Sequence, residues 1–390
     1  MLIYRLVFII CLLTACHDDS VSSRPLILED ASTTGVDGTW SNPDTQPSDQ
    51  AILSDALSNP DQTLTPTPSY DFESQSPWYT CPDPEFGSEV IEITAFDRAD
   101  HYFNPENLRN ILTEIEFPEG NWSQIGMWID LECPESQRCD HWDRSASIQL
   151  QTSTSEPQSL SDQIELTRYI TPYRKAMCQF IDVTELSAHL TGPQILTSWI
   201  DTWVGPGHEQ GEGWRITVKF FFFPGNAPAP EVLNVWGRRS ITVGQVEPEL
   251  SVTAQTEPVN FMLPDSFSRV IAHLITTGHS FGNTDNCAEF CEMRQDLIIN
   301  DTVYSTNPWR PDCDQNPVTA QLGTWTYPRN GWCPGAVAVG DRIDITRDVS
   351  PGINRLDFDI LLASGTVYVN TNPVDLLPHE WVSLKLYIYP

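Results

Sequence analysis

The sequence predicts an all-β protein, and two observations carry that prediction. Segments rich in β-branched and aromatic residues recur along the chain, and many are bounded by Pro, Gly, Asn or Asp, as strands are. Amphipathic helical patterns are scarce, and only residues 104–114 and 184–189 each favour one short helix. The segments expected to form strands are residues 145–151, 195–203, 214–222, 267–277, 296–304, 356–362 and 381–389.

A proline-rich passage at residues 224–230 interrupts the strand pattern near the middle of the chain. Such a passage is typical of a link between domains, because proline cannot donate to a sheet ladder. It divides the chain into two β-sandwiches of ordinary domain size. We expect the first sandwich over residues 81–225, a linker over 226–236 and the second sandwich over 237–390.

The first sixteen residues have the form of an export signal. Arg5 precedes an apolar run at residues 6–13, which is too short to span a bilayer as a mature helix. Residues 13–16 read Leu-Thr-Ala-Cys, and small residues before a cysteine here are typical of a bacterial lipobox, in which Cys16 becomes the lipidated N-terminus. The lipobox predicts a membrane-anchored lipoprotein in the periplasm or at the cell surface. An ordinary cleaved signal with an incidental cysteine is the alternative.

Residues 17–80 are rich in Ser, Thr, Pro and Asp and carry no sustained apolar periodicity. Because such a segment cannot bury enough apolar surface to offset its ordering entropy, we expect a disordered acidic tether. The whole chain has 53 acidic against 21 basic residues, a formal net charge of −32. That excess argues against nucleic acid as a partner, since binding phosphates needs concentrated positive charge.

Cysteine usage indicates an oxidising compartment. Apart from Cys11 and Cys16, eight cysteines remain, and an even number in an exported chain predicts disulfides. Their number alone leaves the pairing open. A zinc site built from the two close cysteine pairs is the alternative, although the spacers and the one nearby histidine, His141, fit it poorly.

Two segments concentrate residues that can do chemistry. The second half of the chain carries His279, then Cys-Ala-Glu-Phe-Cys at residues 287–291 and Arg-Asn-Gly-Trp-Cys at 329–333. The first half carries Glu-Cys-Pro at residues 132–134 and Arg-Cys-Asp-His-Trp-Asp-Arg at 138–144. A carboxylate between two close cysteines, near an arginine and a tryptophan that precede another cysteine, is typical of a rigid polar pocket rather than of a core.

In order and composition these motifs resemble the peptide:N-glycosidase F family, amidases that remove N-linked glycans from asparagine. The family patterns are Glu-Cys-Pro with Cys-Asp-x-Trp-Asp-Arg in the first domain, and Cys-Ala-Glu-aromatic-Cys with Arg-x-Gly-Trp-Cys-Pro-Gly in the second. Further matches lie at residues 96–97, 168–173, 181–184 and 201–203, so the resemblance covers residues 90–345.

The resemblance implies two eight-stranded antiparallel jelly-roll sandwiches packed side by side, with the active site at their interface. It also implies three disulfides, Cys133–Cys139, Cys287–Cys291 and Cys313–Cys333. Cys81 and Cys178 remain, and we expect them to pair with each other. Short disulfide loops add only about 2 to 3 kcal/mol each in the chain-entropy model. Their larger effect here would be to hold nearby carboxylates in place.

The resemblance further implies the catalytic residues. Asp143 and Glu289 match the family carboxylates that bridge a water, with Asp143 as the principal one, and Asp201 stands where the family has Glu. Hydrolysis of an asparagine amide needs an activated water and proton delivery to the leaving group. Buried carboxylates that repel each other supply both, because their pKa values separate. Taken alone, each acid would more often be a solvated surface group or an ion-pair partner.

Six further residues are expected to contact substrate, namely Arg144, Trp142, Trp203, His279, Arg329 and Trp332. Arg329 matches the family residue that contacts the core chitobiose, and His279 matches a site histidine. Arg144 and Arg329 offer donors for carbonyl or sugar oxygens, and a structural salt bridge is the alternative for each. The three indoles could stack on the apolar faces of sugars.

The implied activity is that of a peptide-N4-(N-acetyl-β-glucosaminyl)asparagine amidase, a monomer that acts on N-glycosylated proteins or glycopeptides without a cofactor. Copper monooxygenase chemistry, suggested by a similar fold, needs clustered histidines, and the eight histidines here form no His-x-His. Phe290 and Thr277 stand at positions where the family can have Trp, and Asp201 is one methylene shorter than Glu. A glycan-binding surface lipoprotein of the same fold with weak or no catalysis is therefore the alternative.

Overall fold

The computed structural model describes residues 84–151, 163–316, 318, 320–372 and 377–390, which all fall within one compact unit. The lipobox at residues 13–16, the tether at 17–80 and Cys81 lie outside the described residues, so these expectations stay predictions. Within the described ranges, no helix is long and apolar enough to cross a membrane.

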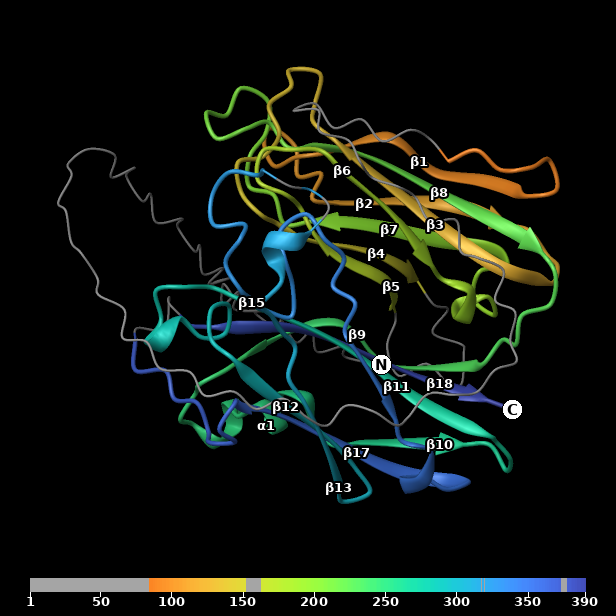
Figure 1. The fold of residues 1–390 in the computed structure, drawn as a ribbon, viewed down its shortest axis with the longest axis vertical. Coiled ribbons are helices and arrows are strands. Elements are labelled where there is room, and N and C mark those ends of the chain that lie inside the picture. The colour runs from red at the N-terminus through yellow and green to blue at the C-terminus, as the bar shows by residue number, and fades with distance from the viewer. Residues whose placement is uncertain (1–83, 152–162, 317, 319, 373–376) are drawn as a thin grey trace, which may run out of the picture. The chain divides into compact units, whose positions relative to one another are not determined.

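The first half of the described chain forms an eight-stranded antiparallel sandwich (Figure 1). Its strands are β1 (Ile91–His101), β2 (Asn110–Phe117), β3 (Trp122–Glu132), β4 (Ser145–Gln151), β5 (Gln163–Ile170), β6 (Met177–Asp182), β7 (Gly192–Ile200) and β8 (Trp214–Pro224). One sheet has the order β1-β8-β3-β6 and the other β2-β7-β4-β5. Alternate residues of the central strands face the core, as the two-residue period of a strand requires. Examples are Ile125, Met127, Ile129 and Leu131 on β3.

The second half forms another eight-stranded antiparallel sandwich with a separate core. Its strands are β9 (Glu231–Thr242), β10 (Val259–Leu263), β11 (Arg269–His279), β12 (Met293–Ile299), β13 (Thr302–Thr306), β16 (Asp341–Asp344), β17 (Gly352–Leu362) and β18 (His379–Tyr389). The sheets have the orders β16-β11-β18-β9 and β10-β17-β12-β13. A two-stranded pair joins β14 (Trp309–Arg310) to β15 (Arg329–Asn330).

Helical structure is limited to short pieces among the described residues. They are α1 (Val252–Thr256) and the 3₁₀ turns η1 (Thr184–Leu186), η2 (Pro248–Leu250), η3 (Thr284–Asn286), η4 (Cys313–Gln315) and η5 (Thr346–Asp348). Only α1 has a side-chain N-cap, in which Ser251 accepts from the main chain of Ala254.

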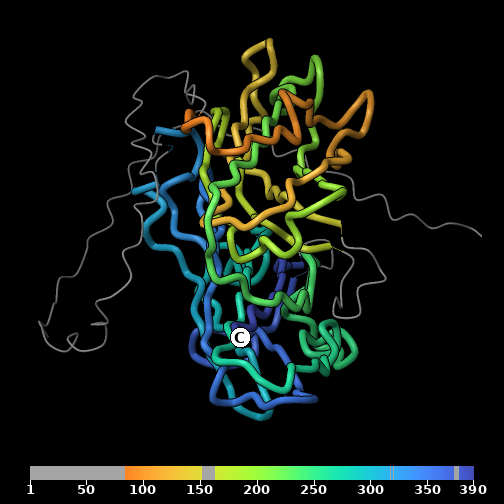
Figure 2. The backbone as a smooth tube through the Cα atoms, turned by 90° about the vertical axis from the view of Figure 1, so that its right-hand side faces the viewer, coloured from red at the N-terminus to blue at the C-terminus, as the bar shows by residue number. Residues whose placement is uncertain are grey.

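A segment of the second sandwich covers the edge of strand β5 in the first. The main-chain nitrogens of Gly335 and Ile170 donate to the carbonyls of Ile170 and Ala336, at 2.9 and 3.0 Å, and Ala338 donates to Arg168 at 2.9 Å. Figure 2 shows this blue stretch of chain running alongside the first sandwich. The edge of β5 therefore has backbone partners from the second sandwich. This pairing also brings β15, which lies shortly before residues 335–338, toward the first sandwich.

Buried charges also join the two sandwiches. Arg168 and Glu165 on β5 form an ion pair at 2.7 Å with both side chains fully buried. Lys385 on β18 donates to the carbonyl of Glu165 at 2.7 Å, and Arg168 donates to the carbonyl of Trp381. Because unpaired buried charges are costly, these bonds fix how β5 and β18 pack.

The all-β fold and the two eight-stranded jelly rolls are confirmed, and several local expectations are corrected. The helix expected at 104–114 is wrong, because Asn110–Phe117 is strand β2, and 184–189 contains only the turn η1. The strand expected at 296–304 is a hairpin, with positive φ angles at Asn300 and Asp301 between β12 and β13. Strand β9 begins at Glu231, inside the linker expected at 226–236.

Candidate functional site

The site begins where two neighbouring strands of the first sandwich end. Asp143 lies two residues before β4, and Asp201 directly follows β7. The strands pair with Ala146 opposite Ile200, and the main-chain nitrogen of Asp201 donates to the carbonyl of Ser145 at 3.0 Å. Antiparallel pairing therefore places both predicted acids at one edge of the sheet.

Arg329 links the two principal carboxylates across the sandwich interface. Its Nη2 lies 3.4 Å from Oδ2 of Asp143, and its Nε lies 3.4 Å from Oε1 of Glu289. The arginine side chain is fully buried, whereas each carboxylate keeps 12% of its side-chain surface exposed. The two acids are thus held by one cation, and both can still be reached from solvent.

The guanidinium of Arg329 has a fixed orientation. Its Nη1 donates to the carbonyls of Thr324 and Tyr327 at 2.8 and 2.9 Å, and its Nη2 donates to the hydroxyls of Thr324 and Tyr173 at 2.8 and 3.2 Å. The rings of Phe290 and Trp332 flank it, with centroids 5.0 and 4.7 Å from Cζ. A planar guanidinium with partners on all three nitrogens resists rotation.

The electrostatics of this array separate the two carboxylates. Burial raises the pKa of Asp143 to about 6, although Arg329 and a hydrogen bond from Tyr173 oppose the rise. Burial and then the charge of Asp143 raise the pKa of Glu289 to about 8. The two carboxyl groups therefore titrate as a coupled pair, which retains one proton around neutral pH.

The side chain of Arg144 forms a structural ion pair with Asp140. Its Nε donates to Oδ2 of the fully buried Asp140 at 2.7 Å, and its Nη2 donates to the other oxygen at 3.3 Å. Thr202 also donates to Asp140, at 2.7 Å. The salt-bridge alternative stated for Arg144 is the one that the structure contains.

Trp332 lies beneath the site and does not line it. Its ring is only 2% exposed, and its Nε1 donates to the carbonyl of Gly278 at 2.7 Å. His279 stacks on this ring with centroids 5.3 Å apart and bonds the Thr277 hydroxyl through Nε2 at 2.9 Å. The expectation that Trp332 stacks on a sugar is corrected, because its face packs against Arg329 and His279.

Trp142, Trp203 and Asp201 are accessible. Both indoles are exposed large rings, and Trp142 Nε1 donates to Oε1 of Gln210 at 3.3 Å. Asp201 is 38% exposed on its side chain and lies 3.7 Å from Nη1 of Arg109. Among the described residues, no hydrogen bond or ion pair connects Asp201 to Asp143 or Glu289.

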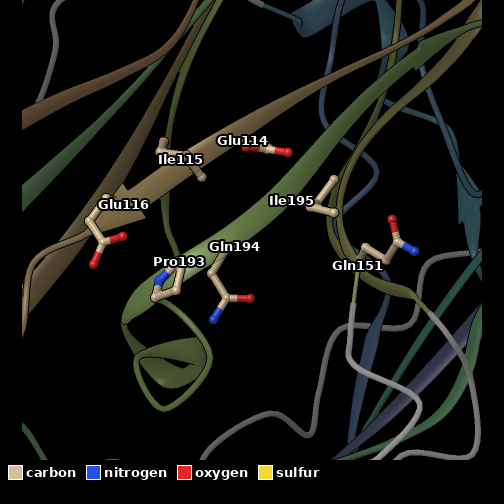
Figure 3. A pocket seen from close by; sticks show the side chains of 7 residues that line it. All are labelled: Glu114, Ile115, Glu116, Gln151, Pro193, Gln194 and Ile195. Atoms are coloured by element: carbon tan, nitrogen blue, oxygen red, sulfur yellow. The ribbon is translucent and has the colours of Figure 1, made fainter.

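Two cavities lie on the first sandwich. One of about 390 Å³ has Trp203 in its wall and is lined by Phe103, Asn104, Trp203, Gly205, Pro206, Gly207 and His208. The other, of about 520 Å³, contains none of the predicted residues. Figure 3 shows its side chains along β2, β7 and the end of β4: Glu114, Ile115, Glu116, Gln151, Pro193, Gln194 and Ile195.

The three disulfides implied by the motifs are confirmed: Cys133–Cys139, Cys287–Cys291 and Cys313–Cys333. The first two close the loop before Asp143 and the loop that holds Glu289, and their cysteines are therefore not free for the alternative zinc site. Cys178 is also disulfide-bonded. Its pairing with Cys81 stays a prediction. In the described part of the chain, no group of three or more suitable side chains could hold a metal ion.

Sequence reasoning missed several residues that support the array. Tyr173 and Thr324 bond Arg329, and Asn330 bonds the fully buried Glu380 on β18 at 2.7 Å. Tyr173 closes the matched motif at residues 168–173, which was a usable signal. Nothing in the local sequence marks Glu380, because only the sheet pairing brings β18 beside the site.

The fold and the site define a tandem jelly-roll β-sandwich protein with an arginine-linked carboxylate pair between its sandwiches. Comparisons with known proteins agree with that class. Residues 248–365 match the family model described as "Peptide-N-glycosidase F, C terminal". The "Peptide-N(4)-(N-acetyl-beta-D-glucosaminyl)asparagine amidase F" of Elizabethkingia miricola is 27% identical over 280 residues, covering 67% of this chain and 75% of that protein.

Solved structures show the same fold. PNGase F, titled a glycosylasparaginase from Flavobacterium meningosepticum, matches with a TM-score of 0.64 and 21% identity over 77% of this chain and 96% of its own. PNGF-II matches with a TM-score of 0.59 and 19% identity over 77% of this chain and 66% of its own. The chain is similar to the peptide:N-glycosidase F family in the sequence of residues 248–365 and to PNGase F in its fold.

Proposed function

We propose that this chain is a hydrolase of the linear amide between asparagine and the innermost N-acetylglucosamine of N-linked glycoproteins or glycopeptides. The observation that best supports the proposal is the array in which Asp143 and Glu289 each lie 3.4 Å from the Arg329 guanidinium. The name of the Elizabethkingia miricola relative describes the same amide cleavage.

The two carboxylates divide the chemistry between them. Asp143, with its pKa raised only to about 6, is ionised at neutral pH and takes a proton from a water that attacks the asparagine side-chain carbonyl. Glu289, with its pKa raised to about 8, keeps a proton and gives it to the leaving nitrogen as the C–N bond breaks. The products are aspartate and a glycosylamine.

Arg329 has a positioning and electrostatic part in this scheme. Its charge opposes the burial that raises the pKa of Asp143 and so keeps the base ionised. Because every nitrogen of its guanidinium is bonded, it holds Asp143 and Glu289 at fixed places relative to each other. The exposed indoles Trp142 and Trp203 offer faces on which sugar rings could stack.

The test is to incubate purified protein with an N-glycosylated peptide and to follow the peptide by mass spectrometry. Conversion of the glycosylated asparagine to aspartate supports the amidase, and Asp143→Asn serves as the matched inactive control. A glycopeptide that stays intact contradicts it.

One observation favours the alternative, a glycan-binding protein with weak catalysis. Asp201 pairs with Arg109 at 3.7 Å and makes no bond to the Asp143–Glu289 pair among the described residues. If the family's third acid is needed at the pair, its retraction here would slow catalysis. Retention of the intact glycopeptide by immobilised protein, with no aspartate formed, would identify this case.

We also propose that the protein is exported and anchored in a bacterial membrane through lipidated Cys16. Three disulfides among the described residues support an oxidising compartment, because cytosolic thiols stay reduced. The lipobox at residues 13–16 supports the anchor.

A further inference from the structure

Asn330 and Glu380 form a buried polar pair directly behind the carboxylate array. Asn330 follows Arg329 on β15, and Glu380 is the second residue of β18. Both side chains are fully buried, and Nδ2 of Asn330 donates to Oε1 of Glu380 at 2.7 Å. Neither residue has a part in the proposed proton transfers.

Each member of this pair has one oxygen without a hydrogen-bond partner, Oδ1 on Asn330 and Oε2 on Glu380. An ionised carboxylate can only accept, so it cannot satisfy the amide oxygen. A neutral carboxyl group carries an O–H, which can donate to that amide oxygen while its carbonyl accepts from Nδ2. Because buried polar atoms without partners are costly, the pair is complete only when Glu380 holds a proton.

The surroundings of Glu380 favour its neutral form. Burial raises its pKa to about 8, against the opposing charge of Arg168 from β5. The imidazoles of His279 on β11 and His379 on β18 have their pKa values lowered by burial and add no charge at neutral pH. The guanidinium of Arg238 on β9 lies over the Trp381 ring, with its Cζ 4.7 Å from the ring centroid.

Asn330 connects this pair to both halves of the array. It is bonded through the peptide link to Arg329, and its main-chain nitrogen donates to the carbonyl of Glu289 at 3.0 Å. Gly278 stands opposite Glu380 in the β11–β18 register, and a Cβ there would lie 2.9 Å from Nδ2 of Asn330 and 2.2 Å from the carbonyl oxygen of Ala288. Because Gly278 has no side chain, β11 can lie close to both Ala288 and Asn330.

We propose that Glu380 is a positioning residue whose neutral carboxyl group clamps Asn330 and thereby holds Arg329 and Glu289 in their working geometry. Ionisation of Glu380 removes the donor from the clamp and loosens the array. The inference rests on the proposed amidase function for its kinetic consequences, but its structural consequence is independent of any activity.

The kinetic test compares kcat and KM across pH for the wild type and Glu380→Gln. Glutamine keeps the size, the acceptor and a donor, so kcat at neutral pH should stay within about twofold. In the wild type, loss of protons from both Glu289 and Glu380 should make log kcat fall with a slope of about two on the alkaline side, and Glu380→Gln should reduce that slope to about one. An unchanged slope would overturn the proposal.

A second pair of variants exchanges the two groups. Asn330→Asp alone sets two carboxyl groups against each other and should lower kcat by about tenfold or more with little change in KM. Adding Glu380→Gln restores one amide and one carboxyl group, with their places exchanged, and should recover most of kcat. Wild-type kcat in Asn330→Asp, or no recovery in the double variant, would count against the clamp.

The structural test needs no substrate. Since burial raises the pKa of Glu380, the folded wild type should lose stability relative to Glu380→Gln as pH rises from about 4.5 to about 8. Asp359→Asn is the control that should leave the kinetic slope unchanged, because Asp359 is a half-buried acid with a raised pKa on β17, in the sheet of the second sandwich that does not contain β18. Parallel melting curves for the wild type and Glu380→Gln at every pH would refute the clamp, whereas absence of aspartate formation would refute only the amidase.

Discussion

Nη2 of Arg329 and Oδ2 of Asp143 lie 3.4 Å apart although 186 residues separate them in the sequence. The contact exists because residues 335–338 of the second sandwich pair with the edge of β5 in the first. The carboxylate array is therefore a product of how the sandwiches pack. Neither sandwich alone contains both acids.

The Asp143–Glu289 pair should give a bell-shaped dependence of kcat on pH. Activity should rise as Asp143 ionises near its pKa of about 6 and fall as Glu289 loses its proton near about 8. Asp143→Asn should reduce kcat by about two decades or more with folding retained, because asparagine is nearly isosteric but cannot accept the proton. Glycan release measured from pH 4 to 10, with circular dichroism of each variant, checks both statements. A fully active Asp143→Asn protein would exclude this base.

Arg329→Gln should lower kcat and move its pH profile toward alkaline values. The arginine charge lowers the pKa of both acids, so its removal raises both and leaves less ionised Asp143 at neutral pH. The matched control is Arg310→Gln on the partner strand β14, where the arginine pairs at 2.8 Å with the more exposed Asp312. That control should keep wild-type rates, and an equal loss in both variants would indicate damage to the β14–β15 pair instead.

Asp201 should respond to the length of its side chain. If it takes part in hydrolysis, Asp201→Asn should depress glycan release strongly, whereas Asp201→Glu should retain or increase it, since a shift of about 1 Å in a preorganised site can change the rate about a hundredfold. Arg109→Gln releases Asp201 from its 3.7 Å ion pair and also removes the guanidinium that lies 4.0 Å from the Trp203 ring centroid, so its effect reports on Asp201 only where Asp201→Asn abolishes it. Normal activity in Asp201→Asn would remove this residue from the site.

Cys16→Ser should move the protein from the membrane to the soluble fraction. A lipidated cysteine supplies the anchor in a lipoprotein, so its loss leaves an ordinary exported chain. Cell fractionation with labelling by a radioactive fatty acid distinguishes the lipid-anchored protein from an ordinary exported chain. Cys11→Ser is the control within the same signal. Unchanged lipid labelling in Cys16→Ser would reject the lipobox.

Much of this architecture could be predicted because its signals are local. Asp143 and Glu289 were predicted from the resemblance of two short motifs to the family patterns, and each motif is contiguous in sequence. Strand β2 was misread as helix, although Thr113, Ile115 and Phe117 alternate in burial with Glu114 and Glu116 along it.

The residues that sequence could not assign depend on contacts between distant strands. Trp332 lies within a motif, but only the structure shows that its ring packs under Arg329 rather than facing substrate. Glu380 lies 50 residues from Asn330 and reaches it through the pairing of β18 with β11. The burial of Trp332 and the hydrogen bond between Asn330 and Glu380 follow from how distant strands pack, and the periodicity of the local sequence does not specify that packing.

The most direct test of the proposed chemistry is hydrolysis of an N-glycopeptide in water enriched in heavy oxygen. If Asp143 activates water for attack on the asparagine amide, mass spectrometry should find aspartate in the peptide with one heavy oxygen in its new carboxyl group, and Asp143→Asn should form none at a comparable rate. Release of the glycan from a peptide that keeps its asparagine, or an intact glycopeptide after prolonged incubation with the wild type, would contradict this chemistry.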